Sequence, residues 1–237
     1  MVAFRNEGEH DRQDILNLIP LDPEVIVALR QAQEQHRLGS LTTETIRSIA
    51  DATEHKSPFR GGHGRHVGRY ARFLAEAMGV PDSEVRSIEW GGVLHDLGKT
   101  LVSEDILLKP APLTPQEWER MRQHPATGAD IATALGFLDE AGRYVRYHHE
   151  RFDGTGYLEG LRGREIPLGS RIIAVVDAYD AMTTERPYRK GRNGAAAIQE
   201  LLECSGTQFD PTVVASFVEI WKKGEIEPLQ NLPTTQV

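Results

Sequence analysis

Cysteine is almost absent from this chain of 237 residues, where Cys204 stands alone. A single cysteine excludes an internal disulfide and fits a reducing compartment. The chain also lacks an apolar run of transmembrane length, and its first twenty residues lack the apolar region of a signal peptide. We therefore expect a cytoplasmic protein without a membrane segment.

Basic residues are also fewer than acidic ones. The chain has 27 basic and 35 acidic residues, which gives a net charge of −8. Such a balance argues against a protein that binds nucleic acid polymers or membrane surfaces. It leaves room for a small anionic ligand, which needs only a local basic patch. The hydrophobic fraction of 39% is sufficient for a packed core.

Signals for β-hairpins are missing, whereas apolar residues recur at helical spacing through most of the chain. Asp22-Pro23 and Asp210-Pro211 are typical helix starts, and Thr114 to Glu117 form a capping box with proline in the first turn. The sequence predicts an all-α protein. Helices are expected at about 22–39, 43–55, 63–79, 82–98, 114–124, 127–136, in a segment that reaches 149, and at 171–182, 194–204 and 210–223.

The domain organisation follows from these elements and the polar ends of the chain. We predict a leader or linker at 1–20, N-terminal helices at 21–55, a catalytic domain at 56–224 and a flexible tail at 225–237. The N-terminal helices are expected to cap the main domain, or to join it to a second copy of the chain or a regulatory partner. Residues 150–170 form a long glycine-rich stretch, and ordered loops of such length are often functional.

One set of polar side chains stands out because its members lie at predicted helix ends or inside apolar helical stretches. The set is His63, His95, Asp96, His124, His148, His149 and Asp177. Each residue alone has an ordinary structural explanation, such as a capping histidine or a paired aspartate. Together they are too many for one zinc site, which takes about four ligands. They are enough for two octahedral ions bridged by Asp96, and nitrogen and oxygen ligands suit iron, manganese, nickel or zinc.

The order of these residues resembles a known family, the HD-GYP phosphodiesterases of the HD superfamily. The resemblance covers about residues 50–220. The matching segments are Gly62-His63, His95 to Lys99, His124-Pro125, His148 to Tyr157, Ile166 to Leu168, and Asp177 to Arg189. Leu158 replaces the proline of the Gly-Tyr-Pro motif, so we expect the backbone near Tyr157 to be less restrained. Phe59 stands where relatives with a third metal have glutamate, which favours two metals.

The resemblance implies an HD-type helical bundle that hydrolyses cyclic di-GMP to pGpG, which the family's enzymes often convert further to GMP; whether the product here is pGpG or GMP stays open. A hydroxide activated by two divalent ions, with iron or manganese favoured over nickel or zinc, would attack phosphorus. Asp96 would hold both ions. Lys99, Arg186 and Arg189 would neutralise charge on the phosphate, and Tyr157 would pack against a guanine. Glu150 and Asp153 are expected to orient the loop or the histidines instead of binding metal.

Two other functions stay open at this stage. One is an HD-type phosphohydrolase that acts on another cyclic dinucleotide or nucleotide. The other is a non-catalytic cyclic di-GMP receptor. The specific loop motif and the two arginines favour the cyclic di-GMP phosphodiesterase, and the complete set of predicted ligands argues against a degenerate receptor.

Overall fold

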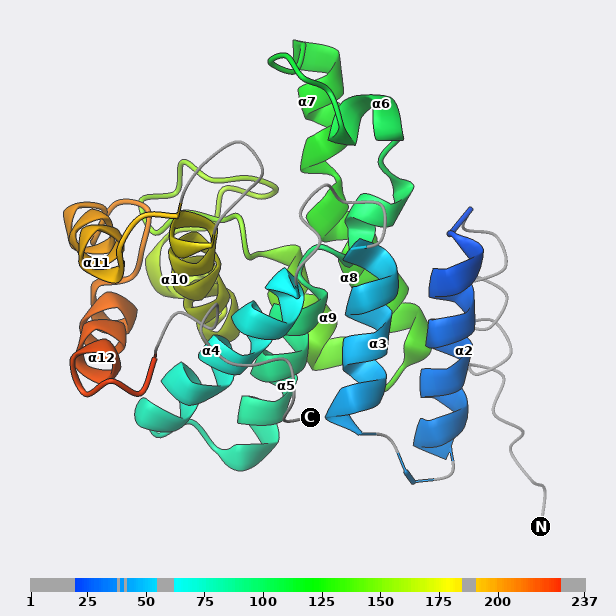
Figure 1. The fold of residues 1–237 in the computed structure, drawn as a ribbon, viewed down its shortest axis with the longest axis horizontal. Helices are drawn as coiled ribbons and strands as arrows, with labels where there is room; N and C mark the ends of the chain where they lie inside the picture. The colour runs from blue at the N-terminus through cyan, green and yellow to red at the C-terminus, as the bar shows by residue number, and fades with distance from the viewer. Residues whose placement is uncertain (1–19, 38, 41, 55–61, 185–190, 227–237) are drawn as a thin grey trace.

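The computed structural model of the chain describes residues 20–37, 39–40, 42–54, 62–184 and 191–226. Apart from an isolated bridge between Ser205 and Phe209, regular structure in the described residues is helical (Figure 1). The predicted all-α class is confirmed. The elements are α2 (Pro23–Arg37), α3 (Thr43–Glu54), α4 (His63–Ala77), α5 (Asp82–Leu94), the 3₁₀ segment η1 (Leu97–Leu101), α6 (Glu104–Leu107), α7 (Pro115–Arg122), α8 (His124–Leu135), α9 (Asp139–Arg146), the 3₁₀ segment η2 (Gly163–Glu165), α10 (Leu168–Thr183), α11 (Gly194–Glu203) and α12 (Pro211–Lys222).

Helix starts follow local chemistry closely. The Thr114 hydroxyl accepts a hydrogen bond from the Glu117 backbone N–H, and the Glu117 carboxylate accepts one from the Thr114 N–H, so the predicted capping box is present. Asp210 caps α12 by accepting from the Thr212 N–H at 2.8 Å. These contacts satisfy backbone donors that a helix start leaves open.

Helix α5 connects two hydrophobic cores. Its first half contributes Val85 and Ile88 to a core that also contains apolar residues of α4, α10, α11 and α12. Its end contributes Val93 and Leu94 to a second core, shared with α2, α3, α8 and α9. Figure 1 shows α11 and α12 at one end of the molecule and α2 and α3 at the other. The sequence directly after α5 continues in this second core through Leu97.

The N-terminal helices pack directly on this body. Val25 and Leu29 of α2 and Ile46 and Ile49 of α3 are buried in the same core as the end of α5. The predicted capping of the main domain by these helices agrees with that packing, whereas the boundary near residue 55 and a partner bound through α2 and α3 remain predictions. None of the described helices combines the length and apolar content needed to cross a membrane.

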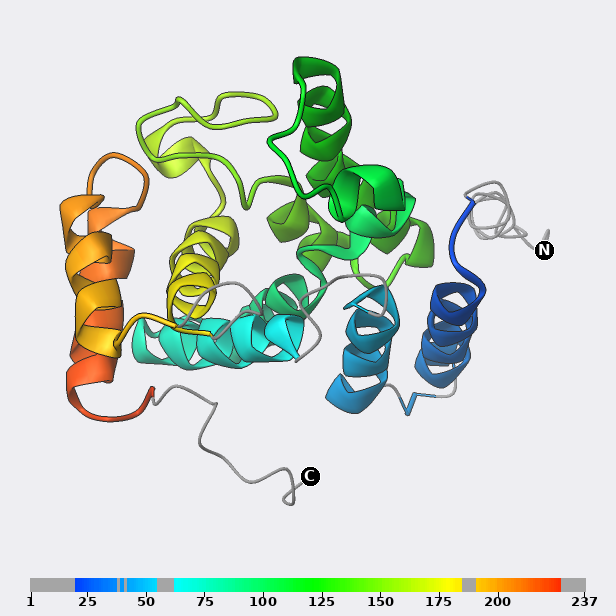
Figure 2. The same ribbon diagram turned by 45° about the horizontal axis from the view of Figure 1, so that its top comes forward.

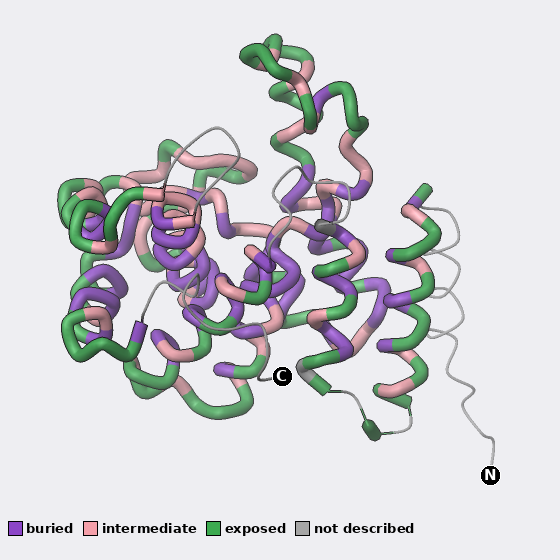
Figure 3. The backbone as a smooth tube through the Cα atoms, viewed as in Figure 1, coloured by how far each residue is buried: buried purple, intermediate pink, exposed green. Residues whose placement is uncertain are grey.

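The segment with α6 and α7 projects from the body (Figures 1 and 2). Helix α7 has no buried residue, and Trp118 is 47% exposed. Figure 3 shows this projection mostly in the colour of exposed residues. The glycine-rich loop between α9 and α10 lies on the same side of the molecule (Figure 2). These two segments border the region that contains the predicted ligands.

Three predicted helix ends were wrong. Helix α5 ends at Leu94 and not at Gly98, because Asp96 leaves helical geometry at φ −97° and ψ 7° and the chain continues in η1. His124 begins α8 instead of ending the preceding helix, because the missing N–H of Pro125 is tolerated in a first helical turn. Helix α9 ends at Arg146, before the two adjacent histidines.

Candidate metal centre

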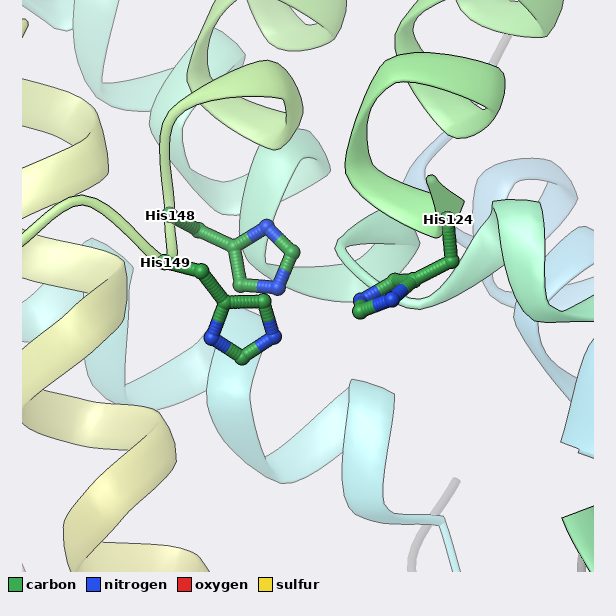
Figure 4. Close-up of side chains that lie close together, drawn as sticks. All are labelled: His124, His148 and His149. Atoms are coloured by element: carbon green, nitrogen blue, oxygen red, sulfur yellow. The ribbon is translucent and has the colours of Figure 1, made fainter. Parts of the chain in front are cut away.

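All seven predicted ligands lie together, although they come from five separate places in the sequence. His63 begins α4, directly after Gly62, whose φ of 77° is readily adopted by glycine. Asp177 lies in α10, and the remaining five follow or begin the other helices around it. Figure 4 shows the rings of His124, His148 and His149 close to one another, with His124 approaching from α8.

Three of the histidines are oriented by the same local contact. The Nδ1–H of His95 donates to the Gly92 carbonyl at 2.8 Å, that of His124 to the Met121 carbonyl at 2.8 Å, and that of His148 to the Val145 carbonyl at 2.6 Å. A carbonyl only accepts, so the proton must lie on Nδ1. In the neutral ring the Nε2 atom is then the lone-pair donor, and each of these three residues is 2% exposed.

The ligand atoms form two groups. The first contains His124, His148 and His149, and the second contains His63, His95 and Asp177; within each group the ligand atoms lie within 4.8 Å of one another. The carboxylate of Asp96 lies between them. Its Oδ1 is 3.4 Å from the His124 Nε2, and its Oδ2 is 3.5 Å from the His95 Nε2. This arrangement is suited to two cations that share one carboxylate.

Several of these atoms fit a cation because they are buried without another partner. The Nε2 atoms of His124 and His148 and the Oδ1 of Asp96 form no hydrogen bond within the described structure. A buried polar atom left without a partner is costly, and two lone pairs that face each other at 3.4 Å repel. A divalent ion between them would remove both costs. The donor set, nitrogen and oxygen without sulfur, matches borderline metals.

Burial keeps His148 and His149 neutral. It lowers the pKa of His148 well below its usual range, an effect that His149 increases, and it lowers the pKa of His149 to about 3. Neutral imidazoles are the form that binds metal. Burial would raise the pKa of Asp96, but Lys99 and His95 outweigh it and hold that pKa well below its usual range. The centre thus contains a carboxylate that stays ionised beside neutral rings.

His63 behaves differently. Burial disfavours its charged form, but hydrogen bonds to Asp177 and Asp180 raise its pKa to about 10. Its Nε2 lies 3.2 Å from the Asp177 Oδ1, and its Nδ1 lies 2.7 Å from the Asp180 Oδ2. A metal at Nε2 would take the place of the proton there, while Asp180 would keep accepting from Nδ1–H. A carboxylate in that position fixes the ring for metal binding.

Asp180 is a residue that sequence reasoning quoted without giving it a role. Its side chain is 3% exposed and also lies 3.1 Å from the His66 Nδ1. Asp177 and Asp180 are three positions apart on α10, so they lie on the same helical face. That spacing was the available signal. His66 is thereby placed beside the centre through a carboxylate that it shares with His63.

The predicted substrate residues are only partly within the described chain. Arg186 and Arg189 lie outside the described residues. Lys99 does not share a helical face with His95, because η1 replaces the last turn; its Nζ lies 2.6 Å from the Asp96 Oδ2 instead. Tyr157 does reach the centre, where its ring stacks on His149 with centroids 4.9 Å apart and planes 26° apart.

The glycine-rich loop is held by its own carboxylates, as predicted. Glu150 accepts from the backbone N–H groups of Glu159 at 2.7 Å and Gly160 at 3.0 Å. Asp153 pairs with Arg151 at 3.0 Å and accepts from the Thr155 N–H. Glu150 thus fixes the backbone of Glu159 and Gly160, directly after Leu158. The prediction of a less restrained backbone there stays untested.

Comparison with known proteins identifies this architecture. Residues 47–213, well over half of the chain, match the HD domain family. The chain is a member of the HD domain family. The resemblance found from sequence is therefore confirmed, and the HD match begins within α3, so part of the N-terminal helices falls inside it.

Curated relatives of this HD domain chain degrade cyclic dinucleotides, according to their names. It is 32% identical over 216 residues to the cyclic di-GMP phosphodiesterase response regulator RpfG of Xanthomonas campestris, covering 90% of this chain and 55% of the relative. It is 33% identical over 186 residues to 3'3'-cGAMP-specific phosphodiesterase 2 of Vibrio cholerae, covering 78% and 36%. The HD domain chain thus spans about half of the first relative and about a third of the second.

A solved structure supports the fold. An HDG"Y"P protein of Bdellovibrio bacteriovorus matches with a TM-score of 0.56 at 18% identity, covering 90% of this chain and 69% of that one. The likeness extends over nearly the whole HD domain chain, which places the helical bundle in the same fold.

Proposed function

We propose that this HD domain is a metal-dependent phosphodiesterase that hydrolyses cyclic di-GMP to pGpG and further to GMP. The observation that supports it best is the pair of ligand groups joined by Asp96, in which the Nε2 atoms of His124 and His148 and the Oδ1 of Asp96 are buried without a hydrogen-bond partner. Its likeness to a protein named as a cyclic di-GMP phosphodiesterase adds the substrate class.

Two divalent ions, when bound, would supply an activated water and neutralise charge on the scissile phosphate. The residues that would hold them are the seven of the centre, with Asp96 between the two groups. Lys99 would donate from Nζ to a phosphate oxygen as charge accumulates there. Tyr157 would offer its ring to a guanine near His149. The buried imidazoles would keep their orientation through the carbonyl contacts, so the centre is organised before substrate arrives.

The test combines metal analysis of anaerobically purified protein with a hydrolysis assay on cyclic di-GMP. We expect about two metals per chain, with iron or manganese favoured over nickel or zinc. Protein stripped with chelator should lose turnover and regain it when metal is returned. Loaded protein that binds cyclic di-GMP without hydrolysing it would contradict the proposal in favour of a receptor.

The assay should also include 3'3'-cGAMP, because one relative is named as specific for it. A panel of cyclic di-GMP, 3'3'-cGAMP and cyclic di-AMP would compare values of kcat/KM. We expect cyclic di-GMP to have the highest value. A preference for 3'3'-cGAMP would keep the reaction class and correct the substrate.

Removing the charge of Lys99 is expected to affect metal affinity and turnover differently. Its ammonium group shares the Asp96 carboxylate with the proposed cations, since Nζ lies 2.6 Å from Oδ2. Lys99→Met should therefore leave metal affinity unchanged or raise it, because a competing positive charge is lost. It should lower kcat/KM for cyclic di-GMP by roughly one to three orders of magnitude, the scale for a lost transition-state donor.

Titration with Mn²⁺ and initial-rate kinetics measure the two effects separately. Lys109→Met is a suitable control, because Lys109 pairs with Glu117 in the projecting segment. Wild-type kinetics in Lys99→Met would show that Lys99 only forms an ion pair with Asp96 and does not contact the phosphate.

A further inference from the structure

Arg122 is the last residue of α7 and contacts Tyr157, a residue of the glycine-rich loop beside the candidate metal centre. Its guanidinium carbon is 5.4 Å from the centroid of the Tyr157 ring, a cation–π distance. The same ring stacks on the proposed ligand His149. One contact therefore joins the projecting segment to the glycine-rich loop above the histidine group. Sequence reasoning assigned no role to Arg122.

We propose that Arg122 and Tyr157 form a clamp for one purine base of the cyclic dinucleotide, a proposal that rests on the function given above. Bases stack on aromatic rings and on guanidinium planes alike. In this chain one surface of each kind lies beside the centre, and the two surfaces contact each other. The clamp would hold the nucleobase while the phosphate lies at Asp96.

The separation of the two groups is consistent with a base that enters between them. Stacked atoms sit about 3.5 Å apart, so a base needs the guanidinium and the ring to be about 7 Å apart. They are now 5.4 Å apart, and the arginine must withdraw by roughly 2 Å. Arg122 is exposed, and α7 has no buried residue to resist the movement. Rotation of its long side chain is sufficient, and no core has to repack.

Arg122 is also available for this role. Within the described part of the chain it forms no ion pair, unlike Arg146, which pairs with Glu159, and Arg151, which pairs with Asp153. Both of those arginines belong to the same loop region but are neutralised there. A guanidinium without a carboxylate can stack on a base without first losing another partner.

The experiment compares Arg122→Ala with wild type on two substrates. Cyclic di-GMP carries bases, whereas methyl p-nitrophenyl phosphate is a phosphodiester without a nucleobase. For cyclic di-GMP we expect KM and the equilibrium dissociation constant to rise roughly 5- to 100-fold with kcat little changed, as stacking losses of this kind predict. Turnover of methyl p-nitrophenyl phosphate and metal content should stay at wild-type levels.

Two matched variants sharpen the result. Arg120→Ala removes the same charge two positions earlier on α7, where a side chain points away from that of Arg122; it should leave cyclic di-GMP binding unchanged. Arg122→Lys keeps the charge but has no planar face, so it should recover only part of the affinity. Full recovery by lysine would overturn the clamp, and so would an equal loss on both substrates, which would indicate a phosphate contact.

A different result would contradict the proposed function without deciding whether the clamp exists. Metal-loaded wild type that hydrolyses methyl p-nitrophenyl phosphate but not cyclic di-GMP would contradict the substrate assignment. The clamp would still be judged by direct binding of cyclic di-GMP to wild type and Arg122→Ala. Equal affinities, or no binding by either protein, would overturn it.

Discussion

Asp96→Ala is expected to remove metal and turnover together. Its two carboxylate oxygens face the His124 and His95 rings at 3.4 and 3.5 Å, so one substitution affects both ligand groups. The buried imidazoles would then lose the negative charge that balances the cations. We expect metal content well below two per chain and a fall in kcat/KM of roughly three orders of magnitude or more, the scale of a central catalytic group.

Asp153→Ala is the control for a loop carboxylate, because Asp153 pairs with Arg151 and Thr155 and forms no hydrogen bond or ion pair with a histidine among the described residues. It should retain both metals. Elemental analysis and rates on cyclic di-GMP would be measured for each variant. Full activity of metal-free Asp96→Ala protein would show that the reaction does not use this centre.

Gly98→Ala is expected to have the largest effect on stability. A Cβ at this position would lie 2.0 Å from the His124 carbonyl oxygen and 2.6 Å from the Gly128 backbone nitrogen. Both neighbours are backbone atoms of α8, so η1 and α8 would have to separate. Overpacking usually costs about 1–3 kcal/mol, and backbone neighbours place this site at or beyond the upper end. Since His124 belongs to the displaced segment, metal retention should fall as well.

Gly79→Ala is the control, because it measures the cost of replacing a glycine that has no close backbone neighbour. Nothing lies within 4 Å of a Cβ there, but the φ of 73° disfavours other residues. It should cost about 1–2 kcal/mol and leave metal content unchanged. Urea unfolding of both variants gives the free energies. Equal costs, with metal retained in both, would contradict the importance of the contact between η1 and α8.

Local chemistry in the sequence was sufficient to determine the helical class and many of the helix starts. Thr114 and Asp210 cap helices through contacts that span two or three residues, and such contacts do not depend on the rest of the fold. The ordered motifs from His63 to Asp177 were sufficient to indicate the HD family, because ligands recur in a fixed order along the chain. Their binding of metal remains a prediction.

Only the tertiary structure shows which of the predicted ligands and their partners lie next to each other. His63 and Asp180 are 117 positions apart, and no local signal predicts that their side chains lie 2.7 Å from each other. Packing of α4 against α10 brings them together. The same holds for Arg122 and Tyr157, which belong to two segments that meet only above the folded body.

The position of Lys99 also depended on the tertiary structure, while its contact with the phosphate stays a prediction. A helix continued to Lys99 would place this residue on the face of His95, but the close approach of Gly98 to α8 accompanies a change from α-helix to η1. That change turns the lysine toward Asp96. Periodicity describes which residues face a core, whereas the distance between two backbones decides where a helix must end. The sequence therefore determined the members of the candidate centre, and the packing of η1 and α4 against their neighbours decided their mutual positions.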